Sequence, residues 1–223
     1  LQPILTATTI RQFSRIVFAL FAMTGRVTML GISRWAGTGG SYRTIQRWFY
    51  TTIPWAQVLV CFFRQHLFAP NAVYILAGDE VVVTKAGKHT FGLDRFFSGL
   101  VQKVVPGLAF FAVSLVNTAD QTSSPMAVEQ VVRSKPAPVP TPPPVAPSPT
   151  AKRKPGRPRG SKNKNKADVT LTPELQQIQA MLQALLPKLM GWLSVTYLAL
   201  DGHFGNNNAL QMVRQCNLHL ISK

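Results

Sequence analysis

Two aspartates stand at the ends of apolar, strand-like runs, and their type and position suit them to chemistry. Asp79 follows residues 74–78, and Asp201 follows residues 195–200. Desolvating an ionised carboxylate is costly unless a cation or hydrogen bonds compensate. We expect Mg²⁺ or Mn²⁺, bound through carboxylates, water and phosphate oxygens, to serve phosphoryl transfer here. The alternative is that each aspartate only closes its strand by a hydrogen bond to the next loop.

The residues around Asp79 predict a meander of three strands. Residues 73–84 and 107–116 are β-branched and aromatic runs, and residues 85–88 have the composition of a hairpin turn that leads into residues 89–91. Glu80 is the neighbour of Asp79, and adjacent strand residues face opposite sides of a sheet. We therefore expect Asp79, and not Glu80, to face the site.

The second half of the chain predicts the order helix, strand, helix, strand. The first helix begins with Thr172 as N-cap and Pro173 in the first helical position. The predicted elements are a helix over 172–191, a strand over 192–200, a helix over 206–216 and a strand over 218–222. The whole order, βββ-α-β-α-β, is that of a mixed α/β, ribonuclease H-like sheet. In such a sheet the first and fourth strands are neighbours, so Asp79 and Asp201 would converge.

The front end, residues 1–70, is predicted to be a helical DNA-binding region. Residues 28–36 and 41–50 flank a Gly-rich turn and have the pattern of a helix-turn-helix, with Ser41 as the N-cap of the second helix. On that helix one face is expected to be apolar, and the other suits a major groove. The apolar face has Ile45, Trp48 and Phe49, and the polar face has Tyr42, Arg43, Gln46 and Arg47. An ordinary amphipathic helix pair would have the same pattern.

A linker interrupts the predicted sheet. Residues 134–149 contain eight prolines, and residues 152–166 contain eight Lys or Arg and no acid. The stretch KRKPGRPRGSK at 152–162 resembles an AT-hook, in which arginines lie in a narrow A·T minor groove. A solvated basic linker that makes only phosphate contacts is the alternative. The DNA-contacting residues predicted here are Lys152, Arg153, Lys154, Arg157, Arg159 and Lys162.

The overall charge predicts a polyanionic partner. The 223 residues include 24 Lys and Arg but 8 acids, a formal net charge of +16. The longest apolar run, residues 104–116, is shorter than the ~20 residues of a membrane-spanning helix, so we expect a cytoplasmic, nucleoid-associated protein with no membrane partner. Cys61 and Cys216 lack a CxxC or His-rich neighbour and are expected to be buried free thiols. Ser-His-Asp sets, Walker loops and dinucleotide glycine patterns do not occur.

Two blocks of sequence surround the acids. The first is YILAGDEVVVTKAGKHTFG at 74–92 with FFS at 96–98, and the second is LDGHFGN at 200–206 with LQMVRQ at 210–215. Together they resemble the catalytic blocks of bacterial insertion-sequence transposases of the DDE (Asp-Asp-Glu) superfamily. The resemblance implies that Asp79 and Asp201 are the first two acids of a catalytic triad. It also implies that the third acid, a Glu, lies beyond Lys223, so that the chain is a fragment.

The resemblance further implies the partners and the reaction. They are the DNA of the element's ends and of the target. We also expect Lys85 or Lys88 near the DNA path and a homodimer as one state of the DNA complex. The expected enzyme hydrolyses a phosphodiester at the element's end and joins the freed 3′-hydroxyl to target DNA. The alternative is a non-catalytic, DNA-binding remnant of a transposase. The expected organisation is a DNA-binding region at 1–70, catalytic parts at 71–133 and 172–223, the second incomplete at its end, and the linker at 134–171.

Overall fold

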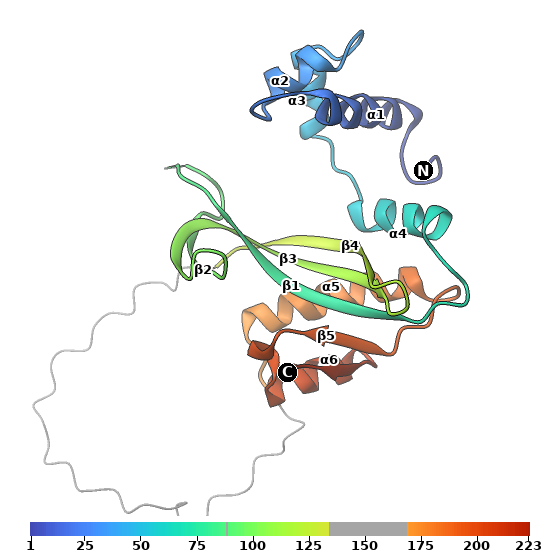
Figure 1. The fold of residues 1–223 in the computed structure, drawn as a ribbon, viewed down its shortest axis with the longest axis vertical. Coiled ribbons are helices and arrows are strands. Elements are labelled where there is room, and N and C mark those ends of the chain that lie inside the picture. The colour runs from blue at the N-terminus through green and yellow to red at the C-terminus, as the bar shows by residue number, and fades with distance from the viewer. Residues whose placement is uncertain (88, 134–168) are drawn as a thin grey trace, which may run out of the picture. The chain divides into compact units, whose positions relative to one another are not determined.

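The structure, a computed structural model, describes residues 1–87, 89–133 and 169–223 (Figure 1). These residues form six α-helices, a short 3₁₀ helix and six strands. In chain order the elements are α1 (Ala7–Ala22), α2 (Met29–Trp35), α3 (Tyr42–Phe49), α4 (Trp55–His66), β1 (Tyr74–Thr84), β2 (Asp94–Ser98), β3 (Lys103–Asn117), β4 (Thr122–Val131), α5 (Pro173–Leu189), β5 (Tyr197–Leu200), η1 (Gly202–Phe204), α6 (Asn207–Gln215) and β6 (His219–Ile221).

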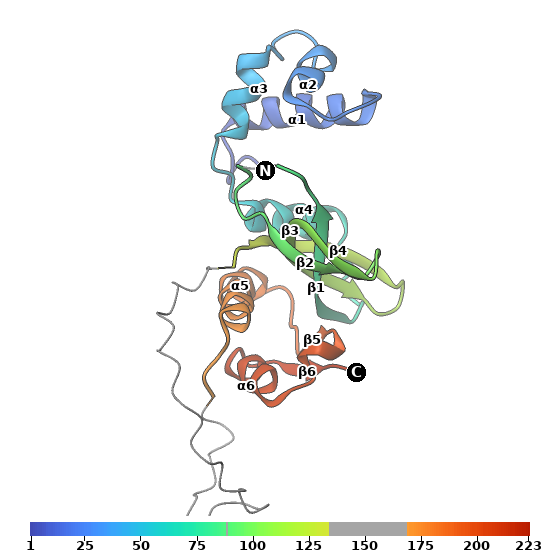
Figure 2. The ribbon, with the colours of Figure 1, turned by 90° about the vertical axis from the view of Figure 1, so that its left-hand side faces the viewer.

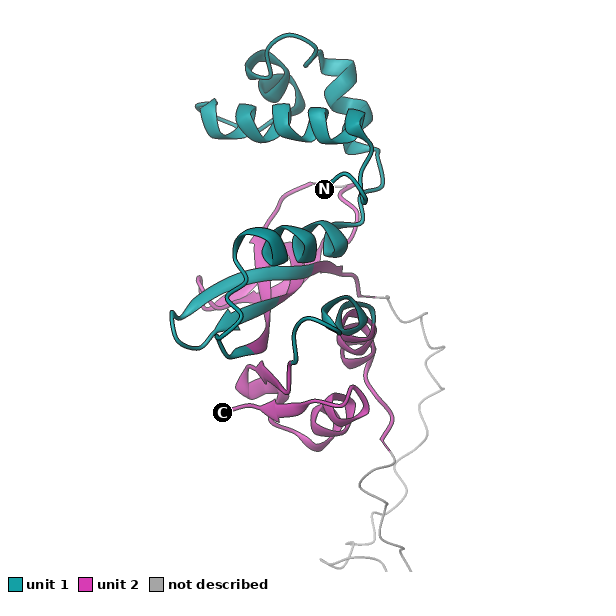
Figure 3. Cartoon of the chain, turned by 90° about the vertical axis from the view of Figure 1, so that its right-hand side faces the viewer, with its two compact units in different colours: residues 1–74, 114–127, 184–194 teal, residues 75–113, 128–183, 195–223 magenta. Residues whose placement is uncertain are grey.

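The chain divides into two compact units (Figure 3). Unit 1 consists of residues 1–74, 114–127 and 184–194, and unit 2 consists of residues 75–113, 128–183 and 195–223. Both units are therefore assembled from segments that are distant in sequence.

The first three helices of unit 1 begin at polar N-caps and enclose an apolar core. The side chains of Thr6, Thr28 and Ser41 accept hydrogen bonds from the backbone of the first turns of α1, α2 and α3, which satisfies donors that a helix start leaves free. The core contains Ile16, Ala19, Ile32, Ile45 and Trp48, among others. The predicted cap at Ser41 is thus confirmed.

The predicted apolar face of α3 is only partly buried. Ile45 and Trp48 are buried, whereas Phe49 is 47% exposed and meets the Trp48 ring edge-on, with centroids 5.2 Å apart. Phe49 is the last residue of α3, so no further turn of the helix follows to cover its ring.

The strands form a mixed sheet of ribonuclease H-like topology. Among the described residues the strand order is β2-β3-β1-β5-β6, and β4 also pairs with β3. β1 pairs with β5 in parallel, and β5 pairs with β6 in parallel, which requires helical crossovers between them. α5 and α6 are those crossovers, and Figure 2 shows both on the same side of β5 and β6. The predicted fold class is therefore confirmed.

The meander differs from the predicted one in two strands. Residues 89–91 are not a strand, and the partner of the first part of β3 is β2, which follows them. β4 was not predicted, because Pro125 and the polar residues before it resemble a break. Pro is tolerated at strand edges, where it need not donate to a ladder, and Pro125 is exposed.

The helices of the second half follow the prediction closely. The Thr172 hydroxyl accepts a hydrogen bond from Leu175 N at 3.3 Å, and α5 begins at Pro173. Asn206 caps α6 through its side chain, which accepts from Ala209 N. Gln179 Nε2 of α5 donates to Gln215 Oε1 of α6 at 2.7 Å, which joins the two crossover helices.

Candidate active site

The register of β1 and β5 brings the two aspartates to equivalent positions in neighbouring strands. The paired residues are Leu76 with Leu198, Ala77 with Ala199 and Gly78 with Leu200. Asp79 and Asp201 each come next after the last of these pairs. Alternate residues of a strand face the same side of a sheet, so Asp79 lies on the face that carries Ala77, and Asp201 leaves β5 directly after the residue paired with Gly78.

Both carboxylates are exposed, and each accepts a hydrogen bond from the backbone amide of the next residue. Glu80 N donates to Asp79 Oδ1 at 2.8 Å, and Gly202 N donates to Asp201 Oδ1 at 2.5 Å. Asp201 is thereby the N-cap of η1. The desolvation that sequence reasoning assumed is absent, because both side chains are open to solvent. Exposure leaves them accessible to a ligand instead.

Glycine and aromatic packing beneath the aspartates positions their strands. A Cβ atom on Gly78 would lie 2.8 Å from Cδ2 of Leu200 and 2.8 Å from Cζ of Phe111. Phe111 meets Phe204 of η1 edge-on, with centroids 6.3 Å apart. The Ser222 hydroxyl donates to the Asp201 carbonyl oxygen at 2.9 Å, so the residue after β6 also ties down the end of β5.

Glu80 lies near four other titratable side chains, which are those of Asp79, Arg133, Glu174 and His203. Burial raises the pKa of the half-buried Glu80 carboxyl, and the nearby Glu174 adds to the increase. Arg133 and His203 lower that pKa, and Asp79 raises it further. The sequence alone does not predict this cluster, because 40 positions that include the linker separate Arg133 from Glu174.

A cavity of about 390 Å³ opens beside the residues that follow Asp201. It is lined by Thr172, Glu174, Leu175, His203, Phe204, Asn206, Asn207 and Asn208. The asparagine amides can both donate and accept hydrogen bonds. Such a lining suits a polar ligand that lies close to the second aspartate.

The donors at the paired aspartates fit a divalent cation. Carboxylate oxygens are ligands that Mg²⁺ accepts alongside water and phosphate oxygens. The backbone amides bind Oδ1 of each aspartate, and Oδ2 is the oxygen that a cation can take. No group of three or more His, Cys, Asp or Glu residues suited to a metal occurs within the part of the chain that the structure describes.

The predicted DNA-contacting residues lie in three places. On α3, Arg43 and Arg47 are exposed and Gln46 is half-buried. Lys85 follows β1 and is exposed, while its backbone nitrogen donates to Pro106 O at 3.1 Å. Lys88, Lys152, Arg153, Lys154, Arg157, Arg159 and Lys162 lie outside the described residues.

The two cysteines are free thiols, as predicted, but only one of them is buried. Cys216 is buried, and burial raises the pKa of its thiol. Cys61 is half-buried, so the prediction for this residue was wrong in part. It lies on a face of α4 that borders a cavity.

The sheet topology, with Asp79 within β1 and Asp201 directly after the neighbouring β5, is that of a class of protein, the ribonuclease H-like nucleases. A family model described as DDE superfamily endonuclease matches residues 1–223, and the chain belongs to this family. The resemblance seen in the sequence is thereby confirmed, and with it action on DNA as the work of the family. Comparison with curated proteins found no match. Among the described helices, none combines the length and the apolar character needed to cross a membrane.

Proposed function

We propose that this protein is a DDE-type transposase that cleaves a phosphodiester at the ends of an insertion sequence and joins the freed 3′ end to target DNA. The observation that carries the proposal is the pairing of Gly78 with Leu200 in the parallel strands β1 and β5, because Asp79 and Asp201 are the next residues of the chain after this pair. Membership of the DDE superfamily endonucleases supports the same chemistry. The family by itself establishes a nuclease-like or transposase-like protein. Transposition is the further step of this proposal.

In this proposal Asp79 and Asp201 hold Mg²⁺ or Mn²⁺. The bound metal would stabilise charge on the phosphoryl oxygens and activate the attacking oxygen. The chain contributes the orientation of the carboxylates, because Glu80 N and Gly202 N each hold one oxygen of the neighbouring aspartate. The asparagines of the adjacent cavity are proposed to contact the strand that is cut.

DNA binding is proposed to use basic residues away from the carboxylates. The exposed Arg43 and Arg47 of α3 would contact the element's ends, and Lys85 would lie along the DNA path. The basic residues 152–166 would add phosphate contacts that depend little on sequence. This division predicts that cleavage and binding can be separated by mutation.

The experiment that tests the proposal measures cleavage of a labelled duplex that carries the element's end. The protein is expressed from its complete reading frame and assayed with Mn²⁺. Asp79→Asn and Asp201→Asn should each lower the cleavage rate by at least about 100-fold, the scale of losing one group that stabilises a transition state. Binding of the same duplex should change little, because the proposed basic contacts remain.

Asp94→Asn is the matched control. Asp94 Oδ1 accepts from Arg95 N at 2.8 Å, the same contact and distance that Asp79 Oδ1 makes with Glu80 N. Asp94 lies on β2, which pairs with β3. In the strand order, β3 and β1 separate β2 from β5. Its variant should cleave within about twofold of the parent. Parental cleavage by the Asp79 and Asp201 variants would overturn the catalytic role of these aspartates. Binding without any cleavage by the parent protein would favour the non-catalytic DNA-binding alternative.

A further inference from the structure

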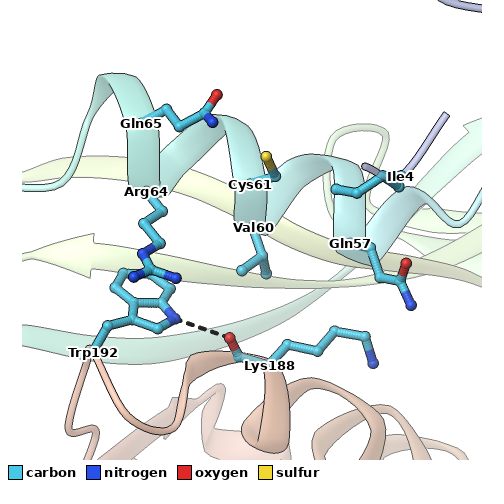
Figure 4. A pocket seen from close by; sticks show the side chains of 8 residues that line it. All are labelled: Ile4, Gln57, Val60, Cys61, Arg64, Gln65, Lys188 and Trp192. Carbon is cyan, nitrogen blue, oxygen red and sulfur yellow. Dashed lines mark hydrogen bonds between the residues drawn. The ribbon is translucent and has the colours of Figure 1, made fainter. Parts of the chain in front are cut away.

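A second cavity, of about 470 Å³, lies within unit 1 along one face of α4 (Figure 4). Five residues of α4 line it at the three- and four-residue spacing that places side chains on one side of a helix. Val60 is the buried member of this set, and the others carry polar groups. The lining consists of Gln57, Val60, Cys61, Arg64 and Gln65 of α4, with Ile4, Lys188 and Trp192.

The lining is cationic and contains no carboxylate. Arg64 and Lys188 are its charged members. Unit 1, all of whose residues the structure describes, has seven arginines and Lys188 but one acid, Asp120. A carboxylate oxygen of Asp120 already accepts from Asn117 Nδ2 at 2.8 Å. Carboxylates of unit 1 therefore do not neutralise the positive charge at the cavity, and this charge favours an anionic ligand.

A fixed indole ring forms one wall of the cavity. Trp192 Nε1 donates to the Lys188 carbonyl oxygen at 3.0 Å, the contact dashed in Figure 4. The Arg64 guanidinium carbon lies 5.5 Å from the centroid of this ring, and Phe68 meets the ring edge-on at 5.1 Å. The ring holds Arg64 in place at little further cost in side-chain entropy, and a guanidinium has five N–H donors to offer a phosphate.

Lys188 and the two glutamines add the remaining donors and acceptors. The Lys188 ammonium donates to the Ala184 carbonyl oxygen, and an ammonium has three donors, so two remain. The exposed amides of Gln57 and Gln65 can donate and accept, as the edge of a nucleobase requires. The size lies within the range of about 300–1,000 Å³ of small-ligand pockets, which admits a nucleotide but not a duplex.

We propose that this cavity binds one nucleotide, with its phosphate at the Arg64 guanidinium beside Trp192 and with Lys188 adding positive charge farther along the lining (Figure 4). The nucleotide belongs either to a single DNA strand or to a free mononucleotide, which share the same phosphate and base. This inference rests on the proposed function in taking DNA as the partner. It adds a strand-binding site at residues that the sequence motifs did not indicate, and it requires neither metal nor cleavage.

Cys61 is a reporter within the lining. The half-buried Cys61 and the buried Cys216 are the chain's two cysteines, and peptide masses distinguish their alkylation. The full chain is alkylated in the presence of oligo(dT), thymidine monophosphate or inorganic phosphate, without metal. Oligo(dT) should slow alkylation of Cys61 at least about tenfold by filling the cavity, while Cys216 remains unmodified as the sign of a folded chain.

The double variant Arg64→Gln, Lys188→Gln should lose this protection, and Arg26→Gln should keep it. Arg26 is also exposed and in unit 1 but does not line the cavity. Equal protection by the mononucleotide assigns the site to free nucleotides, and protection by oligo(dT) alone assigns it to a strand. The proposal would be overturned if none of the three ligands changed the alkylation rate of Cys61. It would also be overturned if Arg26→Gln lost as much protection as the double variant. Since the Asp79→Asn, Asp201→Asn protein should still show protection, failure here is distinct from failure of the catalytic proposal.

Discussion

Gly78 of β1 lies opposite Leu200 of β5, and a Cβ atom on Gly78 would come within 2.8 Å of Cδ2 of Leu200. That distance is shorter than a normal carbon–carbon contact of about 3.5–4.0 Å. The side chain of Leu200 therefore occupies the space that any other residue at position 78 would need. Because Asp79 and Asp201 are the next residues on the two strands, this close approach helps to set the separation of the carboxylates.

Gly78→Ala should destabilise the protein by about 1–3 kcal/mol, the usual cost of an extra methyl group in a packed core. Urea denaturation measures the loss. Gly99→Ala is the control, because a Cβ atom there would have no neighbour within 4 Å. That variant should be neutral or stabilise by up to about 1 kcal/mol, since alanine restricts the unfolded chain. Equal stabilities of the two variants would show that β1 and β5 are not packed as described.

Glu80→Gln should stabilise the protein at neutral pH, by less than about 1 kcal/mol because the carboxyl is partly open to solvent. Burial, Glu174 and Asp79 raise the pKa of Glu80 above its ordinary 4.5, against the opposing effects of Arg133 and His203. A raised folded-state pKa means that its contribution to stability is complete below pH 4.5 and is lost as the pH rises through the folded value. The gain in stability of the Glu80→Gln variant over the parent should therefore vanish below pH 4.5.

Thermal unfolding across the pH range from about 3 to about 8 checks this prediction, because that range brackets the carboxyl pKa values. Glu129→Gln is the control, because Glu129 is an exposed carboxylate on β4. A gain for Glu80→Gln that stays constant down to the acid limit would contradict the pKa shift. It would then reflect packing and not ionisation.

Changing Arg43 and Arg47 of α3 together to Ala should weaken binding to the element's ends while leaving the fold intact. Both are exposed, so their removal opens no space in the core. A loss of about 1–3 kcal/mol is expected for each contact to a base. Electrophoretic mobility shifts on cognate and scrambled duplexes measure it. Arg11→Ala, on α1, serves as the charge control, and equal binding by parent and double variant would refute the recognition-helix proposal.

Replacing the eight Lys and Arg of residues 152–166 by Gln should flatten the dependence of DNA affinity on salt. The slope of log affinity against log salt falls by about 0.9 for each duplex phosphate that the variant no longer neutralises. Titrations at several salt concentrations give the slope for parent and variant. The same change in slope should appear on unrelated duplexes, because phosphates carry no sequence. An unchanged slope would remove this segment from the interface.

Local features of the fold were readable from the sequence because short-range contacts decide them. The caps at Ser41 and Thr172 involve a side chain and a backbone N–H only three residues away. The apolar runs that became β1, β3 and β5 were recognised for the same reason. β4 was missed because Pro125 resembles a break in any local reading, and only its pairing with β3 makes it a strand.

The sequence by itself determined the order of most of the strands and helices and the excess of positive charge, and it singled out Asp79 and Asp201 as candidates. Tertiary structure alone decided that Asp79 and Asp201 follow the same registered pair of strand residues. It also decided that Glu80 shares its surroundings with Arg133 and Glu174, and that Arg64 and Trp192 border one cavity. The physical reason is that local hydrogen bonds select helices and turns, whereas strand register and the meeting of distant side chains depend on which apolar surfaces are buried together.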